Sequence, residues 1–145
     1  MLKRHTFWLW TAVIFLFLNA LIHSLSFFIS PVPHNETERQ LFTLMTEAKL
    51  DMGAGFHRTM KELVTALSSC VTLLFLLAGL VNAFLLKKNA PNDILKGVAG
   101  IEIMIFVAGL VVFLVFAFLL PILLTGVICL LLLAGFFTIP KTGRT

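Results

Sequence analysis

The chain is short of charge. Asp, Glu, Lys and Arg make up 12% of its 145 residues, against about 25% in a typical soluble domain. Hydrophobic residues make up 59%, and the mean hydropathy is +1.04. One or two membrane anchors on a soluble domain would not give this average, because such a domain would supply charges that the chain lacks. The composition therefore excludes a water-soluble globular protein and indicates an integral membrane protein.

The sequence also lacks the common motifs of catalysis and cofactor binding. It contains no phosphate-binding Gly-rich loop, no HExxH, no CxxCH and no basic stretch interleaved with aromatic residues. We therefore expect no nucleic-acid partner and no cofactor, and we favour a non-enzymatic role. The two cysteines, Cys70 and Cys129, form no CxxC pair, and we expect no disulfide.

Long uncharged stretches mark the membrane spans. Residues 7–30 and 63–86 carry no charge, and residues 97–140 carry only Glu102. A helix crosses the apolar core of a bilayer with roughly 20 residues, so the last stretch is long enough for two crossings. Pro121 interrupts a helix and favours a turn near Ala117–Pro121. A kinked third helix with a re-entrant tail is disfavoured, because lipid-exposed backbone without partners is costly.

The sequence thus predicts an all-α integral membrane protein, a four-transmembrane-helix bundle with an extracytoplasmic amphipathic helix in its first loop. The spans are expected at about residues 7–30, 62–86, 97–118 and 121–139, with residues 31–61 as the outer loop and residues 1–145 as a single membrane domain. The first span also carries a small-x-small pattern at Ser24–Ser26, typical of a signal-peptide cleavage site. Since the apolar stretch continues beyond Ser26, we expect this span to be retained.

The basic residues give the predicted spans a direction. Seven of the eleven lie on one side of the predicted membrane: Lys3, Arg4, Lys87, Lys88, Lys96, Lys141 and Arg144. The opposite loop has four basic residues and five acidic ones. Positive charge is enriched in cytoplasmic loops, so both termini are expected in the cytoplasm.

The outer loop has the signals of a helix of its own. Asn35 followed by Glu38 is typical of a helix N-cap with its capping-box partner. Apolar residues then recur at helical spacing, at Leu41, Leu44, Met45, Ala48 and Met52. We expect an amphipathic helix from Glu36 to near Leu50, ended by Gly53–Gly55, with Phe56–Glu62 already beginning the next helix. The amphipathic helix is either a lid or docking surface, or a cap over the helix ends.

Polar side chains within the spans are the candidate functional residues, because such groups are expensive in lipid. Asn19, His23 and Ser26 fall on one face of the first span. In a functional interpretation, His23 transfers protons or binds a metal or haem. In a structural interpretation, it is a neutral histidine that is hydrogen-bonded to a neighbouring helix. Glu102 is expected near the cytoplasmic interface, extending towards Lys87, Lys88 and Lys96. These residues form the predicted polar site in the membrane: Asn19, His23, Ser26 and Glu102.

Two further patterns admit simpler explanations. A small and polar stripe along the second span favours close helix packing, with residues Thr65, Ser68, Thr72, Gly79 and Asn82. His23, Cys70 and Cys129 are predicted at one depth on three helices and could approach a soft-metal site. A structural zinc site needs four ligands and no fourth is evident, so no metal is predicted.

Part of the chain resembles a known group of proteins. The segment Asp51–Met60 (DMGAGFHRTM), the helix end Gly79-Leu80-Val81-Asn82 and the pair His23-Ser24 are similar to small, functionally uncharacterised four-helix bacterial inner-membrane proteins. The resemblance extends over about residues 1–85. It implies the four-span topology and a bacterial origin, and it brings no catalytic residue.

Three functions are compatible with these features. The favoured one is a small multi-pass membrane protein that packs with itself or with a membrane-protein partner in the lipid bilayer. The second is a small solute or proton-linked carrier that uses the polar face around His23. The third is a membrane redox or metal-binding protein that uses His23, Cys70 and Cys129.

Overall fold

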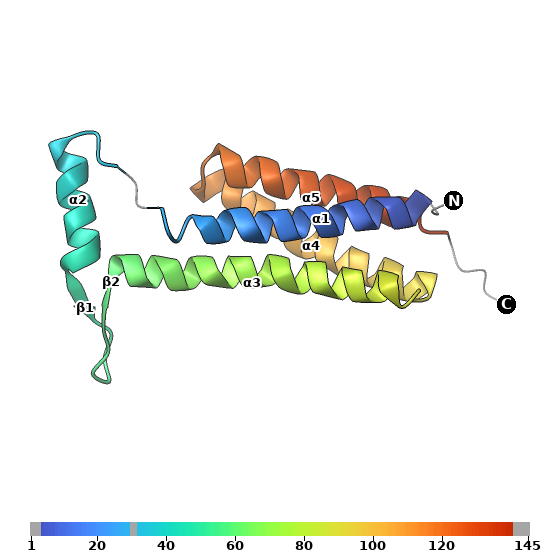
Figure 1. The fold of residues 1–145 in the computed structure, drawn as a ribbon, viewed down its shortest axis with the longest axis horizontal. Helices are drawn as coiled ribbons and strands as arrows, with labels where there is room; N and C mark the ends of the chain where they lie inside the picture. Colours follow the sequence, from blue (N-terminus) through green and yellow to red (C-terminus); the bar gives the residue numbers. More distant parts are fainter. Residues whose placement is uncertain (1–3, 30–31, 141–145) are drawn as a thin grey trace. The chain divides into compact units, whose positions relative to one another are not determined.

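The computed structural model describes residues 4–29 and 32–140 (Figure 1). These residues form five α-helices and two short β-strands. The elements in chain order are α1 (Arg4–Leu25), α2 (Glu36–Glu47), β1 (Lys49–Asp51), β2 (His57–Thr59), α3 (Met60–Lys87), α4 (Asn92–Phe116) and α5 (Leu119–Thr138). Contacts divide the chain into two compact units, residues 1–19 with 75–145, and residues 20–74. The two units are described separately.

Four of the helices, α1, α3, α4 and α5, are long and apolar enough to cross a membrane. They have 22, 28, 25 and 20 residues, and a bilayer core of about 30 Å needs about 20 residues of helix. The composition-based prediction of a membrane protein therefore agrees with the length of these four helices.

The first unit has an apolar core to which all four of these helices contribute. Its buried centre consists of Leu9, Val13, Leu86, Leu95 and Ile139. Two glycines let the helices approach closely. A Cβ atom at Gly135 of α5 would lie 2.7 Å from Leu9 Cδ2, and one at Gly79 of α3 would lie 3.4 Å from Leu16 Cβ. The packing of α1 against α3 and α5 thus depends on positions without a side chain.

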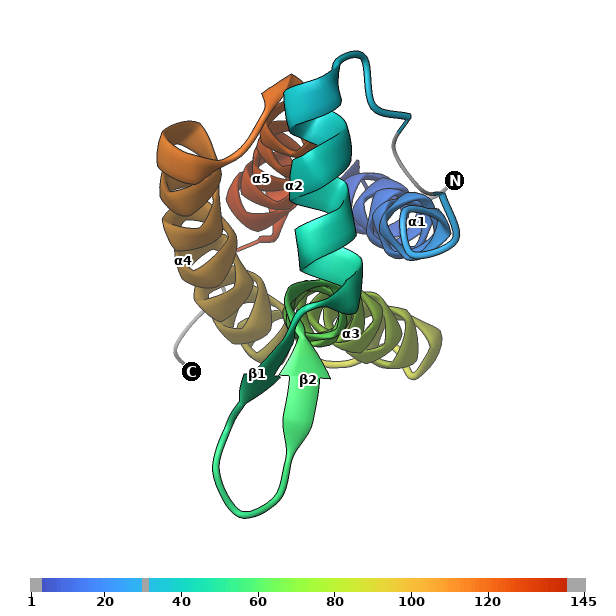
Figure 2. The same cartoon turned by 90° about the vertical axis from the view of Figure 1, so that its left-hand side faces the viewer.

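α4 and α5 are separate helices that lie side by side as an antiparallel pair (Figures 1 and 2). The chain reverses at Ala117 and Phe118, inside the predicted turn. Pro121 lies in the first turn of α5, where its missing N–H costs no helical hydrogen bond. A continuous helix would bring its ring against the carbonyl of Ala117, so the proline favours the break.

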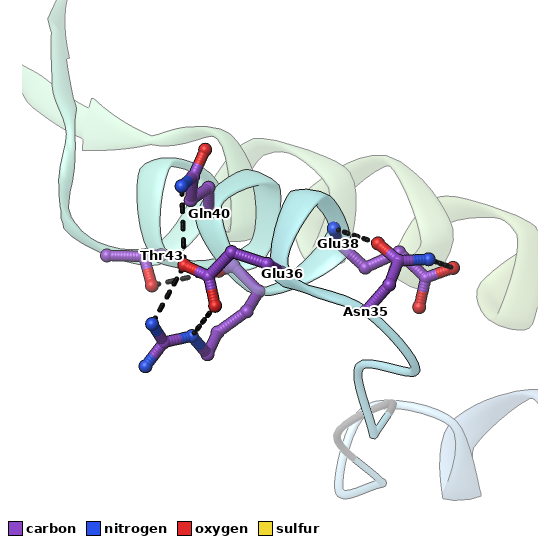
Figure 3. Close-up of polar contacts among 6 residues, drawn as sticks. Asn35, Glu36, Glu38, Gln40 and Thr43 are labelled. Carbon is purple, nitrogen blue, oxygen red and sulfur yellow. Dashed lines mark hydrogen bonds and ion pairs between the residues drawn. The ribbon is translucent and has the colours of Figure 1, made fainter.

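The second unit contains α2, the hairpin and the first part of α3. The predicted N-cap is confirmed: Asn35 Oδ1 accepts a hydrogen bond of 2.8 Å from Glu38 N (Figure 3). The Glu38 carboxylate accepts in return from His34 N at 2.7 Å. α2 ends at Glu47, three residues before the predicted end near Leu50.

A β-hairpin follows α2 in this otherwise helical structure, so the helix predicted at residues 49–50 and 57–59 was wrong. β1 and β2 pair antiparallel with Leu50 opposite Arg58, and Figure 2 shows them as a narrow loop at the start of α3. The glycines form its turn instead of ending a helix. Gly53, Ala54 and Gly55 all have positive φ, at 79°, 50° and 80°, a conformation that glycine adopts without steric cost.

The start of α3 also differs from the expectation that Phe56 begins the helix. Thr59 and Glu62 form a capping box, with Thr59 N donating to Glu62 Oε2 at 2.8 Å and Glu62 N donating to Thr59 Oγ1 at 3.2 Å. This pair satisfies two backbone donors at a helix start. α3 therefore begins at Met60, and residues 57–59 belong to β2.

α1 ends earlier than the first predicted span. Its last helical residue is Leu25, and the next three residues form turns in which Ser26 N, Phe27 N and Phe28 N donate to the carbonyls three residues before them. The last predicted span residue, Ser30, lies outside the described residues.

Candidate functional site

Glu102 lies on the buried face of α4, in the first unit. Leu95, Ala99 and Phe106 share that face, and the Glu102 side chain is 7% exposed. It lies ten residues after Asn92, the first residue of α4, which corresponds to about 15 Å along the helix. Glu102 therefore lies on a face that packs inside the unit, and its depth in a membrane stays a prediction from the sequence.

The hydrogen-bond partner of Glu102 is Asn82 of α3. Asn82 Nδ2 donates to Glu102 Oε2 at 2.6 Å and also to the carbonyl of Ala78 at 3.0 Å. Asn82 is 2% exposed, so the contact is shielded from solvent on both sides. One turn along α4, the rings of Phe106 and Phe75 stack with centroids 5.7 Å apart. The pair is thus a polar contact in an apolar interhelical layer.

The lysines predicted beside Glu102 have other positions. Lys96 Nζ lies 5.0 Å from the ring centroid of Phe136 on α5, a cation–π contact. Lys87 and Lys88 are exposed. The ion pairs within the described ranges include none to Glu102. Its carboxyl group, with one neutral donor, can bind or release a proton without breaking an ion pair.

The other three residues of the predicted site, Asn19, His23 and Ser26, make no hydrogen bond to Glu102 in the described structure. Asn19 is buried in the first unit, but its Nδ2 donates to the carbonyl of Phe15 on its own helix at 2.8 Å. His23 and Ser26 belong to the second unit. The half-buried His23 ring lies 5.8 Å from the ring of Phe27, and Ser26, exposed and past the end of α1, donates to the carbonyl of His23 at 2.6 Å.

The sequence assigned Asn82 to a packing stripe and missed its pairing with Glu102. Of that stripe, Asn82 forms an interhelical hydrogen bond, whereas Thr65 donates to the carbonyl of Lys61 on its own helix. Thr72 Oγ1 is buried without a partner in the described structure. One sequence signal was present: a short connection joins α3 and α4, and Asn82 and Glu102 are polar residues in the halves of the two helices next to it.

The residues suggested for a metal do not gather into a ligand set. Cys70 is an exposed free thiol in the second unit, and Cys129 is a buried free thiol in the first. Over residues 4–29 and 32–140, no three His, Cys, Asp or Glu side chains form a cluster that could hold a metal ion.

The polar face of α2 carries the clearest electrostatic interaction in the second unit. Arg39 makes two hydrogen bonds to the Glu36 carboxylate, of 2.9 and 2.8 Å, and Gln40 Nε2 adds a third at 3.3 Å (Figure 3). The hydrogen-bonded Arg39 guanidinium lowers the pKa of Glu36 below its ordinary value. Both groups are well exposed, so the pair stabilises the start of α2 only locally.

Comparison of the chain with protein-family models, with curated proteins and with solved structures finds no match. The resemblance to small four-helix bacterial inner-membrane proteins therefore stays an expectation from the sequence.

Proposed function

We propose that this chain is a non-enzymatic multi-pass membrane protein that associates with a second copy of itself through α4. In this proposal α1, α3, α4 and α5 form a four-transmembrane-helix bundle, and both termini lie on the cytoplasmic side of a bacterial inner membrane. The segment with α2 and the hairpin then lies outside, with α2 as an amphipathic helix at the membrane surface. The seven basic residues at one side support this orientation.

The proposal of self-association rests on the exposed face of α4. Only 17% of the apolar stretch of α4 is buried, against 28–33% for the other three helices. One set of its exposed residues recurs at alternating steps of four and three along one face, namely Gly97, Ile101, Met104, Ala108, Val111 and Val115. This spacing is typical of a helix–helix seam, and small residues such as Gly97 and Ala108 let two membrane helices approach closely.

Energy transfer between two differently labelled copies in liposomes tests this proposal. Transfer is expected above the level of random proximity and is expected to persist as lipid is added. Gly97→Leu should lower it, because a Cβ at Gly97 meets no atom within 4 Å in its own chain and so disturbs only the outer face. Gly126→Leu on α5 is the matched control, since Gly126 has the same open space. Random-level transfer, or equal loss in both variants, would contradict the proposal.

The buried Glu102 carboxyl favours a second candidate function, a proton-linked carrier. The proton-binding groups would then be the Glu102 carboxyl, which accepts a hydrogen bond from Asn82, and the His23 imidazole of the polar face that the sequence predicts with Asn19 and Ser26. Proton uptake into liposomes loaded with a pH-sensitive dye tests it: Glu102→Gln and His23→Ala should each abolish uptake. Uptake equal to that of empty liposomes for the unmodified protein would reject this function.

A further inference from the structure

A small cavity in the second unit has the chemistry of a lipid site. It has a volume of about 240 Å³ and lies between the end of α1, α2 and the first turns of α3. All of its lining residues fall within residues 20–74, so the cavity belongs to one compact unit. Its volume is somewhat below the roughly 300–1,000 Å³ of sites for drug-sized ligands, and it therefore suits one chain segment of a larger molecule.

The apolar walls of the cavity come from three segments. Phe27 and Ile29 follow α1, Phe42 and Met45 project from α2, and Val64 projects from α3. Ile29 is 71% exposed and Val64 is 47% exposed, so the cavity is open along this side. An acyl chain would cover these exposed apolar side chains, which gives it a favourable free energy of burial.

The polar side of the cavity follows one face of α3. Lys61, Thr65 and Ser68 lie at steps of four and three residues, so they form a line from the first turn of α3 inward. The Thr65 hydroxyl donates to the carbonyl of Lys61 at 2.8 Å and keeps its lone pairs for a ligand. Ser68 makes no hydrogen bond within the part of the chain that the structure describes, so its hydroxyl can donate.

Lys61 is the single charged residue in the lining, and the described residues place no acidic group in an ion pair with it. The α2 wall adds the Thr46 hydroxyl, whose proton goes to the carbonyls of Phe42 and Thr43. The cavity thus combines one free cation, several hydroxyl oxygens and an apolar wall. Such a set matches a molecule with an anionic phosphate for Lys61, an ester carbonyl that accepts from Ser68, hydroxyl groups that donate to the threonine oxygens, and an acyl chain.

We propose that this cavity binds an anionic glycerophospholipid with a hydroxyl-bearing headgroup. Its phosphate lies at Lys61, an ester carbonyl accepts from Ser68, a headgroup hydroxyl donates to Thr65, and part of one acyl chain packs against Phe27, Phe42 and Met45. A fatty acid shares the acyl chain and the negative charge, but it has no ester carbonyl for Ser68 and no headgroup hydroxyl for Thr65. The inference rests on the proposed membrane location, which brings the cavity into contact with lipid. It does not depend on self-association through α4.

Native mass spectrometry of the full chain in a charge-neutral detergent tests this proposal. The probes are phosphatidylglycerol, phosphatidylethanolamine and oleic acid, each titrated at equal concentration. One phosphatidylglycerol is expected to bind up to about fivefold more tightly than phosphatidylethanolamine, the preference that one exposed ion pair provides, because the ammonium of phosphatidylethanolamine cancels its phosphate charge. Because the experiment needs no bilayer, its result is separate from the membrane orientation, which cysteine labelling measures.

Variants locate the bound lipid. Lys61→Gln should abolish the fivefold preference, whereas Lys49→Gln, an exposed lysine of the same unit outside the cavity, should keep it. Val64→Trp should weaken phosphatidylglycerol binding by filling the cavity, with unchanged helix content in circular dichroism. An unchanged preference in Lys61→Gln, equal loss in Lys49→Gln, or tighter binding of oleic acid than of phosphatidylglycerol would overturn the proposal.

Discussion

Asn82 on α3 and Glu102 on α4 are joined by a 2.6 Å hydrogen bond, and both side chains are buried within the first unit. The bond links two helices whose other contacts there are apolar, such as the stacked rings of Phe75 and Phe106. A buried polar group that loses its partner costs more than the bond itself contributes. The pair therefore fixes how α3 and α4 face each other, whatever further role Glu102 has.

Removing one member of this pair should be more harmful than removing both. Asn82→Leu leaves the Glu102 carboxyl buried without a donor and should lower the free energy of unfolding by about 1–3 kcal/mol. The double variant Asn82→Leu, Glu102→Leu should recover most of that loss. Glu102→Gln keeps an acceptor oxygen and should cost less than Glu102→Leu. SDS-induced unfolding of the protein in mixed micelles measures all four.

Glu47→Leu serves as a control for the loss of a glutamate, because Glu47 is exposed on α2. It should change stability by less than about 0.5 kcal/mol. If the double variant at Asn82 and Glu102 costs as much as the sum of the two single variants, the pair is not coupled and this interpretation is wrong.

Close packing of α5 on α1 depends on Gly135. A Cβ there would lie 2.7 Å from Leu9 Cδ2 and 3.1 Å from Leu9 Cγ, and Leu9 is 1% exposed with little room to move. Gly135→Ala should therefore destabilise the protein by about 1–3 kcal/mol. Gly126→Ala, which meets nothing within 4 Å, should be neutral or stabilising. Thermal unfolding in detergent compares them, and equal stability of the two variants would refute the close approach.

Two threonines of α5 should respond in opposite ways to loss of the hydroxyl. Thr125 Oγ1 is buried without a partner in the described structure, whereas Thr138 Oγ1 donates to the carbonyls of Ala134 and Gly135 at 2.7 and 3.0 Å. Thr125→Val should be neutral or stabilising by up to about 1 kcal/mol, because the desolvated hydroxyl disappears. Thr138→Val should lose about 0.5–1.5 kcal/mol. The reverse order in chemical unfolding would contradict the assigned hydrogen bonds.

The start of α2 should weaken in acid. The hydrogen-bonded ion pair between Glu36 and Arg39 lowers the pKa of Glu36 in the folded chain. A lowered pKa means that the ionised form stabilises the helix at pH values above the ordinary glutamate range. That contribution is lost as the pH falls through the lowered value. Amide hydrogen exchange in α2 should therefore show greater opening in acid, after correction for its intrinsic pH dependence.

Arg39→Gln should raise the pKa of Glu36 towards its ordinary value, as followed by the NMR shift of the Glu36 carboxyl carbon. Lys49→Gln, which removes a cation without a hydrogen bond to Glu36, is the matched variant. An identical Glu36 titration in Arg39→Gln and the unmodified protein would show that the ion pair does not form in solution.

The sequence predicted well the features that depend on residues close together in the chain. Uncharged length indicates four long helices, Pro121 marks the reversal between α4 and α5, and Asn35 with Glu38 marks the start of α2. Each depends on residues within a few positions of one another. The capping box of Thr59 and Glu62 is equally local and could have placed the start of α3.

The hairpin and the candidate site could not be predicted from the spacing of apolar residues along the sequence. β1 and β2 have three residues each, and of the six only Thr59 is buried, so no alternating pattern marks them. The partner of Glu102 depends on how α3 and α4 are rotated about their axes. In helices that are apolar on nearly every face, hydropathy does not fix that rotation.

Cysteine labelling tests the central claim, a four-span membrane protein with both termini in the cytoplasm, most directly. Single cysteines are placed at the exposed positions Thr37 and Lys88 after Cys70 and Cys129 have been replaced by alanine. In bacterial spheroplasts a membrane-impermeant maleimide should label Thr37→Cys, and it should label Lys88→Cys only after the membrane is permeabilised. Labelling of both positions in intact spheroplasts, or of Lys88→Cys alone, would contradict the proposed topology.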